Sequence, residues 1–169
     1  MEPISIRELR ASDWAAVEAV FADGIATGHA TFEAEPPPWE RFDSGKVAHS
    51  RFVAVDHDDT ILGWVAASPV SSRPAYSGVV EHSVYVVGSA RGRGIGRALL
   101  EALIASAEEN GVWTIQSSIF PENAASIGLH AEFGFRSVGR RERIALMTYG
   151  PMAGQWRDTV LMEWRSSRT

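Results

Sequence analysis

The sequence contains no cysteine, and this absence removes several kinds of chemistry at once. Disulfide bonds, thiolate metal ligands and thiol nucleophiles all depend on cysteine. A covalent intermediate would need Ser, Thr, Asp, Glu, His or Lys instead. A catalytic cycle through an acylated thiol is therefore excluded.

Long apolar runs are also missing. No stretch approaches the roughly 20 apolar residues that a membrane-spanning helix needs. The first ten residues, MEPISIRELR, do not contain the apolar core of a signal peptide. We therefore expect no membrane segment and a cytoplasmic location.

Positive charge is in short supply, because 16 Lys and Arg face 21 Asp and Glu, for a formal net charge of −5. Binding to a nucleic-acid backbone depends on surplus Lys and Arg, so nucleic acid is not expected as a partner. The length of 169 residues and the hydrophobic fraction of 45% suit one domain with a sizeable core. We expect that domain to cover residues 1–169.

Apolar periodicity predicts the order of the elements. Strands are expected at residues 4–9, 51–55, 61–67, 79–87, 112–119, 136–143 and 158–164. Helices are expected from Trp14 with Ser12 as N-cap, over 39–49, over 95–109 with a stop at Asn110–Gly111, and over 121–134. Trp156 and Trp164 are expected to pack in the core, with a role in an interface as the alternative for either. The fold class is α/β (α+β), with a mixed, mostly antiparallel central sheet flanked by helices.

The segment 87–100, VGSARGRGIGRALL, places glycines and arginines directly before an apolar helical pattern. Free backbone N–H groups and the helix dipole make such a helix start attractive to anions. Gly92, Gly94 and Gly96 are spaced G-x-G-x-G, which fits neither the G-x-G-x-x-G of dinucleotide folds nor the G-x-x-x-x-G-K-[ST] of P-loops. A basic surface turn and another kind of anion site remain as alternatives.

Two motifs resemble those of a known superfamily. The run from Arg91 to Gly96, of the form R-x-x-G-x-G, is similar to the pyrophosphate-binding motif of the GNAT acyl-CoA-dependent N-acyltransferases. One strand downstream, NAASIGLHAEFGF (123–135) resembles their second motif, with His130 where a tyrosine is common. The resemblance implies a single GNAT-type domain that uses acetyl-CoA as co-substrate and no metal.

Three further segments indicate which branch of this superfamily the sequence resembles. TFEAEPP (31–37), AYSGVVEHSVYV (75–86) and GQWRDTVLMEW (154–164) are similar to the phosphinothricin and methionine sulfoximine N-acetyltransferases. This implies transfer of acetyl to the α-amino group of a small amino acid such as phosphinothricin, methionine sulfoximine or methionine sulfone, by direct attack in a ternary complex. It also implies a homodimer and a role in antibiotic or herbicide resistance. An enzyme that acetylates an ordinary metabolite would show the same sequence features.

The resemblance assigns a set of residues to the co-substrate. The residues expected to bind acetyl-CoA are Val84, Tyr85, Val86, Arg91, Gly92, Arg93, Gly94, Ile95, Gly96, Arg97 and Asn123. A backbone N–H near Val84 is expected to stabilise the thioester oxygen as the amine attacks.

Amine acylation requires a neutral nucleophile, so a base must remove a proton from the acceptor. The resemblance points to Glu81 as the base, acting directly or through water, and burial or a water relay would have to support the role. The alternative is an edge-strand carboxylate that faces solvent. His82 is its neighbour, and adjacent strand residues point to opposite faces, so both are not expected to face one substrate. His130 is the predicted acid for the departing thiolate, with a surface histidine as the alternative. Its loss should matter less than loss of Glu81.

The acceptor site is assigned by the same resemblance. Ala75, Tyr76 and the aromatic wall Phe32 are expected to contact the amino acid. Arg73 would pair with its carboxylate, although a solvated surface arginine explains this residue equally well.

Other functions remain open on the sequence alone. The acceptor could be a peptide N-terminus or a polyamine, or the chain could be an acyl-CoA-binding sensor without catalytic activity. An arginine-glycine contact to RNA is a third alternative that the acidic balance disfavours.

Overall fold

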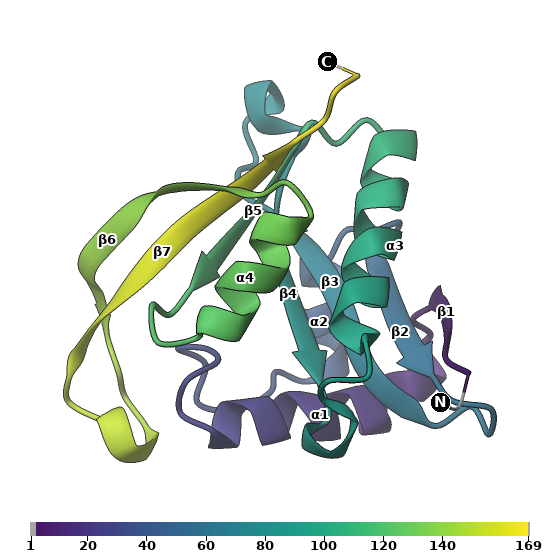
Figure 1. The fold of residues 1–169 in the computed structure, drawn as a ribbon, viewed down its shortest axis with the longest axis horizontal. Helices are drawn as coiled ribbons and strands as arrows, with labels where there is room; N and C mark the ends of the chain where they lie inside the picture. Colours follow the sequence, from purple (N-terminus) through teal and green to yellow (C-terminus); the bar gives the residue numbers. More distant parts are fainter. Residues whose placement is uncertain (1–2, 169) are drawn as a thin grey trace.

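The computed structural model describes residues 3–168, so residues 1, 2 and 169 of the predicted domain lie outside the described part. The described chain forms a seven-stranded sheet in the order β1-β2-β3-β4-β5-β7-β6 (Figure 1). The strands are β1 (Ser5–Glu8), β2 (Arg51–Val55), β3 (Ile61–Pro69), β4 (Val79–Val86), β5 (Thr114–Ile119), β6 (Arg136–Leu146) and β7 (Trp156–Arg165). The helices are α1 (Trp14–Ala26), α2 (Trp39–Gly45), α3 (Ile95–Glu109) and α4 (Ala124–Glu132). Among the strand pairs only β4 and β5 run parallel, which confirms the predicted mixed, mostly antiparallel sheet within residues 3–168.

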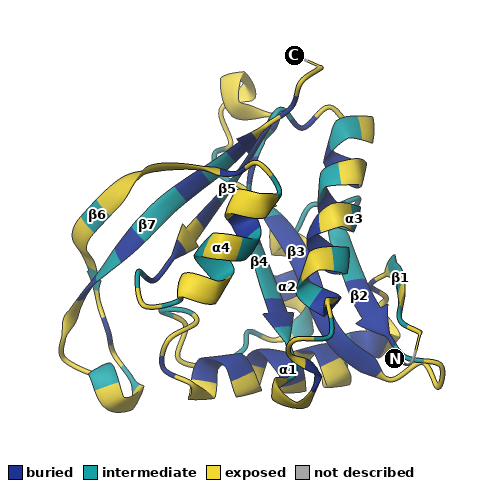
Figure 2. Ribbon diagram, in the orientation of Figure 1, coloured by how far each residue is buried: buried dark blue, intermediate teal, exposed yellow. Residues whose placement is uncertain are grey.

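The sheet is covered on both faces, and Figure 2 shows β3 largely in the dark blue of buried residues. On the face that we call the α1 face, Phe21 of α1 packs its ring on Trp64 and Tyr85 at centroid distances of 5.3 and 4.8 Å. On the opposite face, the α3 face, Leu99 of α3 belongs to a core cluster with Val65 and with residues of β4, β5 and β7. Side chains alternate between the two faces along each strand, so this assignment fixes which way every residue of β4 and β5 points.

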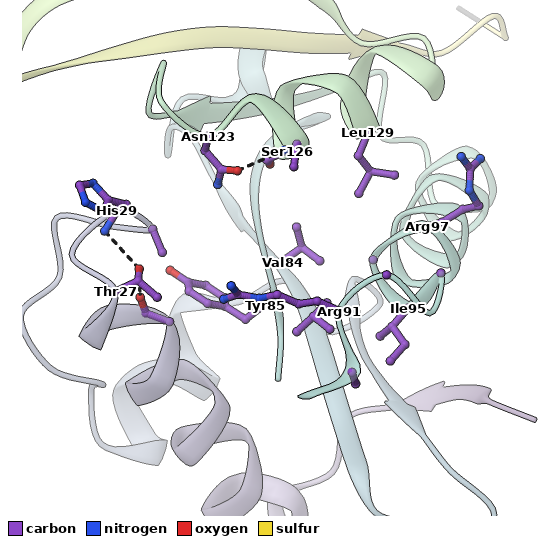
Figure 3. Close-up of a pocket in the computed structure, with 18 of the residues that line it drawn as sticks. Thr27, His29, Val84, Tyr85, Arg91, Ile95, Arg97, Asn123, Ser126 and Leu129 are labelled. Carbon is purple, nitrogen blue, oxygen red and sulfur yellow. Dashed lines mark hydrogen bonds between the residues drawn. The ribbon is translucent and has the colours of Figure 1, made fainter. Parts of the chain in front are cut away.

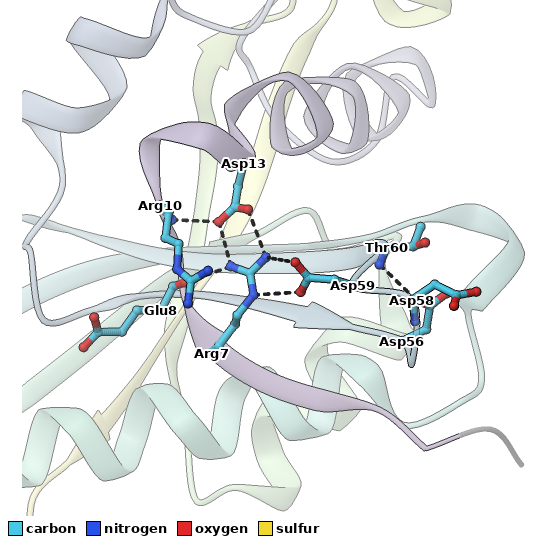
Figure 4. Close-up of polar contacts among 8 residues, drawn as sticks. All are labelled: Arg7, Glu8, Arg10, Asp13, Asp56, Asp58, Asp59 and Thr60. Atoms are coloured by element: carbon cyan, nitrogen blue, oxygen red, sulfur yellow. Dashed lines mark hydrogen bonds and ion pairs between the residues drawn. The ribbon is translucent and has the colours of Figure 1, made fainter.

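Arg7 ties the first strand to the rest of the domain (Figure 4). Its guanidinium donates to both carboxylate oxygens of Asp13, at 2.8 and 3.0 Å, and to Asp59 in the turn between β2 and β3, at 3.0 Å. The bond from Arg7 holds the pKa of Asp13 below its usual range, although burial acts in the opposite direction. This bridge positions the start of α1 against the sheet.

Two predicted helix boundaries were wrong. A 3-10 turn, Ala11–Asp13, precedes α1, and Asp13 rather than Ser12 is the N-cap. The second helix ends at Gly45 instead of residue 49, because Lys46 is extended and the next residue, Val47, donates its N–H to the carbonyl of Ala67 at 2.8 Å. Sheet pairing therefore replaces the last helical turn.

Other local predictions were confirmed. β2 and β3 form the expected antiparallel hairpin, and the Asp56 carboxylate closes its turn by accepting from the N–H groups of Asp58 and Thr60 at 2.9 Å each. α3 spans the predicted 95–109 and ends at Asn110, followed by Gly111 with a φ of 73°. A further helix boundary was wrong, because α4 begins at Ala124, three residues later than expected, with Asn123 as its N-cap.

The β6–β7 hairpin extends past the helices at the left of Figure 1. β6 is exposed or half-buried along its whole length. Trp164 of β7 is buried as predicted, whereas Trp156 is 59% exposed, so the predicted core position of Trp156 was wrong. None of the described helices has the length and apolar character to cross a membrane.

Candidate active site

The sheet is split between β4 and β5. The two strands pair only from Val79 to Glu81 and from Thr114 to Gln116, at one end of each strand. Beyond Glu81, the edge of β4 is not paired to β5, and a cavity of about 90 Å³ lies there. An unpaired strand edge can bind an extended ligand that carries amide groups.

The glycine loop lies at the open end of this split, between β4 and α3 (Figure 1). Gly92 and Gly94 have φ angles of 77° and 79°, a conformation that residues with a Cβ rarely adopt. Gly94 is the N-cap of α3, so the first free N–H groups of the 15-residue helix follow directly. A methyl group on either glycine would meet no described atom within 4 Å, so the space above the loop is open to a ligand.

A larger cavity of about 660 Å³ joins the loop to the split sheet (Figure 3). Its walls come from the end of α1, β4, the glycine loop and α4. The predicted co-substrate residues that line it are Val84, Tyr85, Val86, Arg91, Gly92, Gly94, Ile95, Gly96, Arg97 and Asn123. Arg93, half-buried, is the one predicted residue outside this lining. The structure thus brings ten predicted residues to one cavity, and their binding role stays a prediction.

Further lining residues were missed by the sequence analysis. They are Gly24, Thr27, His29, Ala30, Ala90, Glu122, Ala125, Ser126 and Leu129. Thr27 and His29 come from the end of α1 and the loop after it, where no motif indicated a site. Their place depends on α1 packing beside β4, which is a tertiary contact.

Asn123 has a structural role that the sequence did not show. Its side-chain oxygen accepts from the N–H of Ser126 at 3.2 Å and so caps α4 (Figure 3). This places the first turn of α4 on the wall of both cavities.

His130 is buried, with 1% of its surface exposed, and it contacts a second histidine. Its Nδ1 lies 2.6 Å from the carbonyl of Ser126, and its Nε2 lies 2.9 Å from Nε2 of His82. A carbonyl only accepts, so His130 carries its proton on Nδ1, and Nε2 of His82 donates to Nε2 of His130. The surface alternative for His130 is therefore wrong, and both of its ring nitrogens are already engaged.

Burial disfavours the charged form of both rings. The pKa of His82 lies well below the ordinary 6.5 because of burial, with the charges of His130 and Lys46 acting in the same direction. Burial also lowers the pKa of His130, although the Ser126 carbonyl favours its charged form. The pair is neutral at pH 7 and lines the smaller cavity.

Glu81 points to the α1 face, opposite to His82, as strand alternation predicted. It is half-buried, and its Oε2 accepts from Nε2 of Gln116 at 2.8 Å and from Oγ of Ser118 at 3.2 Å. These two donors from β5 hold the carboxylate at the point where β4 and β5 diverge. Ser118 also lines the smaller cavity.

The predicted acceptor residues are not gathered in one place. Phe32 packs edge-on against Phe120 at 5.0 Å, and Phe120 lines the smaller cavity. Arg73, Ala75 and Tyr76 are exposed in the loop between β3 and β4, where the Arg73 guanidinium lies over the Tyr76 ring at 5.6 Å. None of these three lines either cavity. Their role stays a prediction.

The cavity fits the chemistry of an acyl-CoA. Free N–H groups at the start of α3, with Arg91 and Arg97 beside them, suit a pyrophosphate. The free edge of β4 suits the amides of an extended pantetheine arm, and the split then leads to Glu81. Groups of three or more metal-ligating side chains are absent from the described residues. The split sheet with its glycine loop thus defines an acyltransferase that binds an acyl-CoA.

Comparison with known proteins gives the family. Residues 10–135 match the model of the acetyltransferase (GNAT) family, and the chain belongs to this family. It is 37% identical to a phosphinothricin N-acetyltransferase of Alcaligenes faecalis over 165 residues, which are 94% of this chain and 81% of that protein. It is 31% identical to an L-methionine sulfoximine/L-methionine sulfone acetyltransferase of Pseudomonas paraeruginosa, over 94% of this chain and 92% of that one.

A solved structure agrees with this assignment. A GNAT superfamily phosphinothricin acetyltransferase from Sinorhizobium meliloti, in complex with acetyl-CoA, superposes with a TM-score of 0.86 at 28% identity. The match covers 98% of this chain and 91% of that chain. The protein is an acetyltransferase with acetyl-CoA as its co-substrate.

Proposed function

We propose that this enzyme acetylates the α-amino group of a small amino acid such as phosphinothricin, methionine sulfoximine or methionine sulfone. The observation that carries the proposal is the Glu81 carboxylate, held by Gln116 and Ser118 where β4 and β5 diverge. The functions of the two relatives above support the acceptor class.

Acetyl-CoA supplies the acetyl group as a thioester, and the protein residues handle the proton and the orientation. Glu81 takes a proton from the acceptor ammonium, directly or through one water, so that the amine becomes nucleophilic. Its Oε1 makes no hydrogen bond to a described residue and is available for this transfer. A backbone N–H near Val84, which lines both cavities, stabilises the developing negative charge.

The predicted acid, His130, has no ring proton free to give to the departing thiolate. Its only ring proton is donated to the Ser126 carbonyl, and its Nε2 accepts from His82. To protonate the thiolate, the histidine pair would have to rearrange. A CoA thiolate is a good leaving group without full protonation, so loss of His130 should reduce activity less than loss of Glu81.

The experiment is a thiol-release assay with purified protein and acetyl-CoA. The chain has no cysteine, so a thiol reagent reports released CoA without a protein background. The acceptor panel contains phosphinothricin, methionine sulfoximine, methionine sulfone, ordinary amino acids, spermidine and a short peptide. We expect release with a small amino acid and little with spermidine or peptide. Stronger release with the last two would favour the polyamine or peptide alternative, and tight CoA binding without any release would favour the sensor.

The predicted homodimer belongs to the same proposal. Val138, Ile144, Leu146 and Trp156 are exposed apolar residues on the β6–β7 hairpin, each with more than two fifths of its surface accessible. Exposed apolar side chains on one hairpin are candidates for burial against a second copy. Light scattering on the purified chain tests it. A cytoplasmic location and a role in resistance remain predictions from the sequence.

A further inference from the structure

Polar side chains from three strands form a row on the α1 face, and we call them the α1-face row. They are Glu81 of β4, Gln116 and Ser118 of β5, and Arg141 of β6. Nη2 of Arg141 donates to Oγ of Ser118 at 2.7 Å, and that hydroxyl donates to Oε2 of Glu81 at 3.2 Å. One hydroxyl group therefore separates a guanidinium from the carboxylate of the predicted base.

Arg141 is held in place without a carboxylate partner. Its Nε donates to Oγ1 of Thr159 at 3.2 Å, which fixes the direction of the half-buried side chain. No carboxylate of residues 3–168 lies within 4 Å of it, and its Nη1 makes no hydrogen bond within that range. By contrast, the adjacent Arg140 points to the other face of the sheet and is paired with Asp158. A guanidinium fixed by two hydroxyls keeps donors free for an anion.

The two opposite charges lie on either side of one hydroxyl group, an order that suits an amino acid. A zwitterionic α-amino acid carries its ammonium and carboxylate on the same carbon, so its charges are a short and fixed distance apart. Glu81 would face the ammonium and Arg141 the carboxylate, with Ser118 between them. Ser118 lines the smaller cavity, whereas Glu81 and Arg141 are not among its lining residues, so the amino acid would lie beside this cavity on the α1 face.

Two other cations could in principle meet the carboxylate, Lys46 and Arg73. Lys46 interacts with Glu81, but its Nζ donates to Ser68 at 3.0 Å and lies over the ring of Phe42 at 5.5 Å. Arg73, the residue predicted from the sequence, is exposed and lies over Tyr76. The side chains of Arg141 and Glu81 both form hydrogen bonds to Ser118, and neither Lys46 nor Arg73 has a hydrogen-bond partner in common with the Glu81 carboxylate.

We propose that Arg141 binds the α-carboxylate of the acceptor and so selects free amino acids over amines that lack this group. The proposal rests on the proposed function, since it needs the acceptor amine at Glu81. It assigns a specificity-determining residue that the sequence motifs did not indicate.

The test compares methionine sulfone with its α-carboxamide, which keeps the side chain and amine but has no negative charge. For Arg141→Gln we expect kcat/KM with the free acid to fall about 10- to 100-fold, which is the range for loss of a charge-assisted hydrogen bond. The value with the amide should stay within about twofold. Arg141→Lys should fall between wild type and Arg141→Gln for the acid only, because it keeps the charge and loses the planar fork.

Arg140→Gln is the matched control, since it removes the same side chain one position away on the opposite face. It should leave both substrates unaffected. Equal loss for acid and amide in Arg141→Gln, or a selective loss in Lys46→Gln or Arg73→Gln instead, would overturn the proposal. If Arg141→Gln does not give a cooperative thermal melt, the same comparison of acid and amide is made with Arg141→Lys, and a loss confined to the acid supports the proposal.

Binding separates this proposal from the proposed function. Calorimetry of the CoA-saturated protein measures affinity for methionine sulfone without turnover. If no amine is acetylated but Arg141→Gln selectively weakens binding of the free acid, the proposed function fails and the carboxylate site stands. If wild type does not distinguish acid from amide in binding or turnover, Arg141 is not the anchor.

Discussion

The guanidinium of Arg157 stacks on the ring of Phe120, with its central carbon 3.8 Å from the ring centroid. The same group donates to the carbonyl of Gly28 at 2.7 Å and to Nδ1 of His29 at 3.1 Å. Arg157 is buried, with 3% of its surface exposed, and its hydrogen bonds attach the loop after α1 to β7. His29 in that loop lines both cavities, which connects a buried arginine of β7 to the walls of the active site.

Replacing Arg157 by leucine should loosen this loop. The carbonyl of Gly28 loses its donor, and we expect the free energy of unfolding to fall by about 1–3 kcal/mol. The KM for the acceptor should rise because the wall that His29 forms is no longer fixed. Thermal unfolding and steady-state kinetics measure both effects. Arg165→Leu, an exposed arginine on the same strand, is the control and should change stability by less than about 0.5 kcal/mol. An unchanged melting temperature in Arg157→Leu would contradict the clamping role.

The histidine pair predicts how stability changes with pH. Both His82 and His130 have a pKa below the ordinary 6.5 in the folded state, chiefly through burial. Below about pH 7 the unfolded chain therefore binds more protons than the folded chain, and acidification through 6.5 destabilises the fold. The slope is at most about 1.4 kcal/mol per pH unit for each ring.

The variant His82→Gln tests this dependence. Glutamine keeps a donor for His130 but does not titrate, so its melting temperature should fall less than that of wild type between about pH 7.5 and 5.5. His57→Gln is the control, because this exposed histidine lies in the turn between β2 and β3. Parallel curves for His82→Gln and wild type would show that the buried ring does not cause the decline.

Replacing Glu81 by glutamine should reduce kcat by about 10²-fold or more, the effect expected for a positioned base. The KM for acetyl-CoA should change little, because Glu81 does not line the larger cavity. His130→Gln should reduce kcat less, since the one ring proton of His130 is donated to the Ser126 carbonyl. Glu142→Gln, on an exposed part of β6, is the control. Indifference of the rate to Glu81→Gln would remove Glu81 from the mechanism.

The glycine loop can be tested by its backbone conformation. Gly92→Ala places a Cβ at a φ of 77°, which costs about 1–2 kcal/mol, and it sets a methyl group in the space open to the pyrophosphate. The KM for acetyl-CoA should rise at least about tenfold, while the KM for the acceptor stays nearly constant. Gly88→Ala is the control, because its φ is not positive and a methyl group there also meets open space. If both variants bind acetyl-CoA equally well, the conformation at Gly92 is not what the ligand needs.

Features that depend on neighbouring residues were predictable from the sequence. The hairpin around Asp56, the extent of α3 and its stop at Gly111 follow from turn residues, helical periodicity and a positive φ. The glycine loop was located for the same reason, since its strand, turn and helix are contiguous. Where local and tertiary preferences disagreed, at residues 46–49, pairing of Val47 with Ala67 overrode the helical pattern.

The arrangement of the catalytic groups was decided by tertiary structure. Glu81 and His130 were both predicted as functional residues, but the sequence did not predict their contacts. The pairing of β4 with β5 places Glu81 beside Ser118, and strand alternation turns His82 to the opposite face, where it contacts His130. Arg141 meets Ser118 because β6 pairs with β7 and β7 with β5, contacts that no local pattern encodes. The sequence by itself therefore determined the class of co-substrate and the loop predicted to bind it, through residues adjacent in the chain. The surroundings of the predicted base Glu81, and the cations near it, were decided by long-range strand pairing, which depends on how the whole sheet packs.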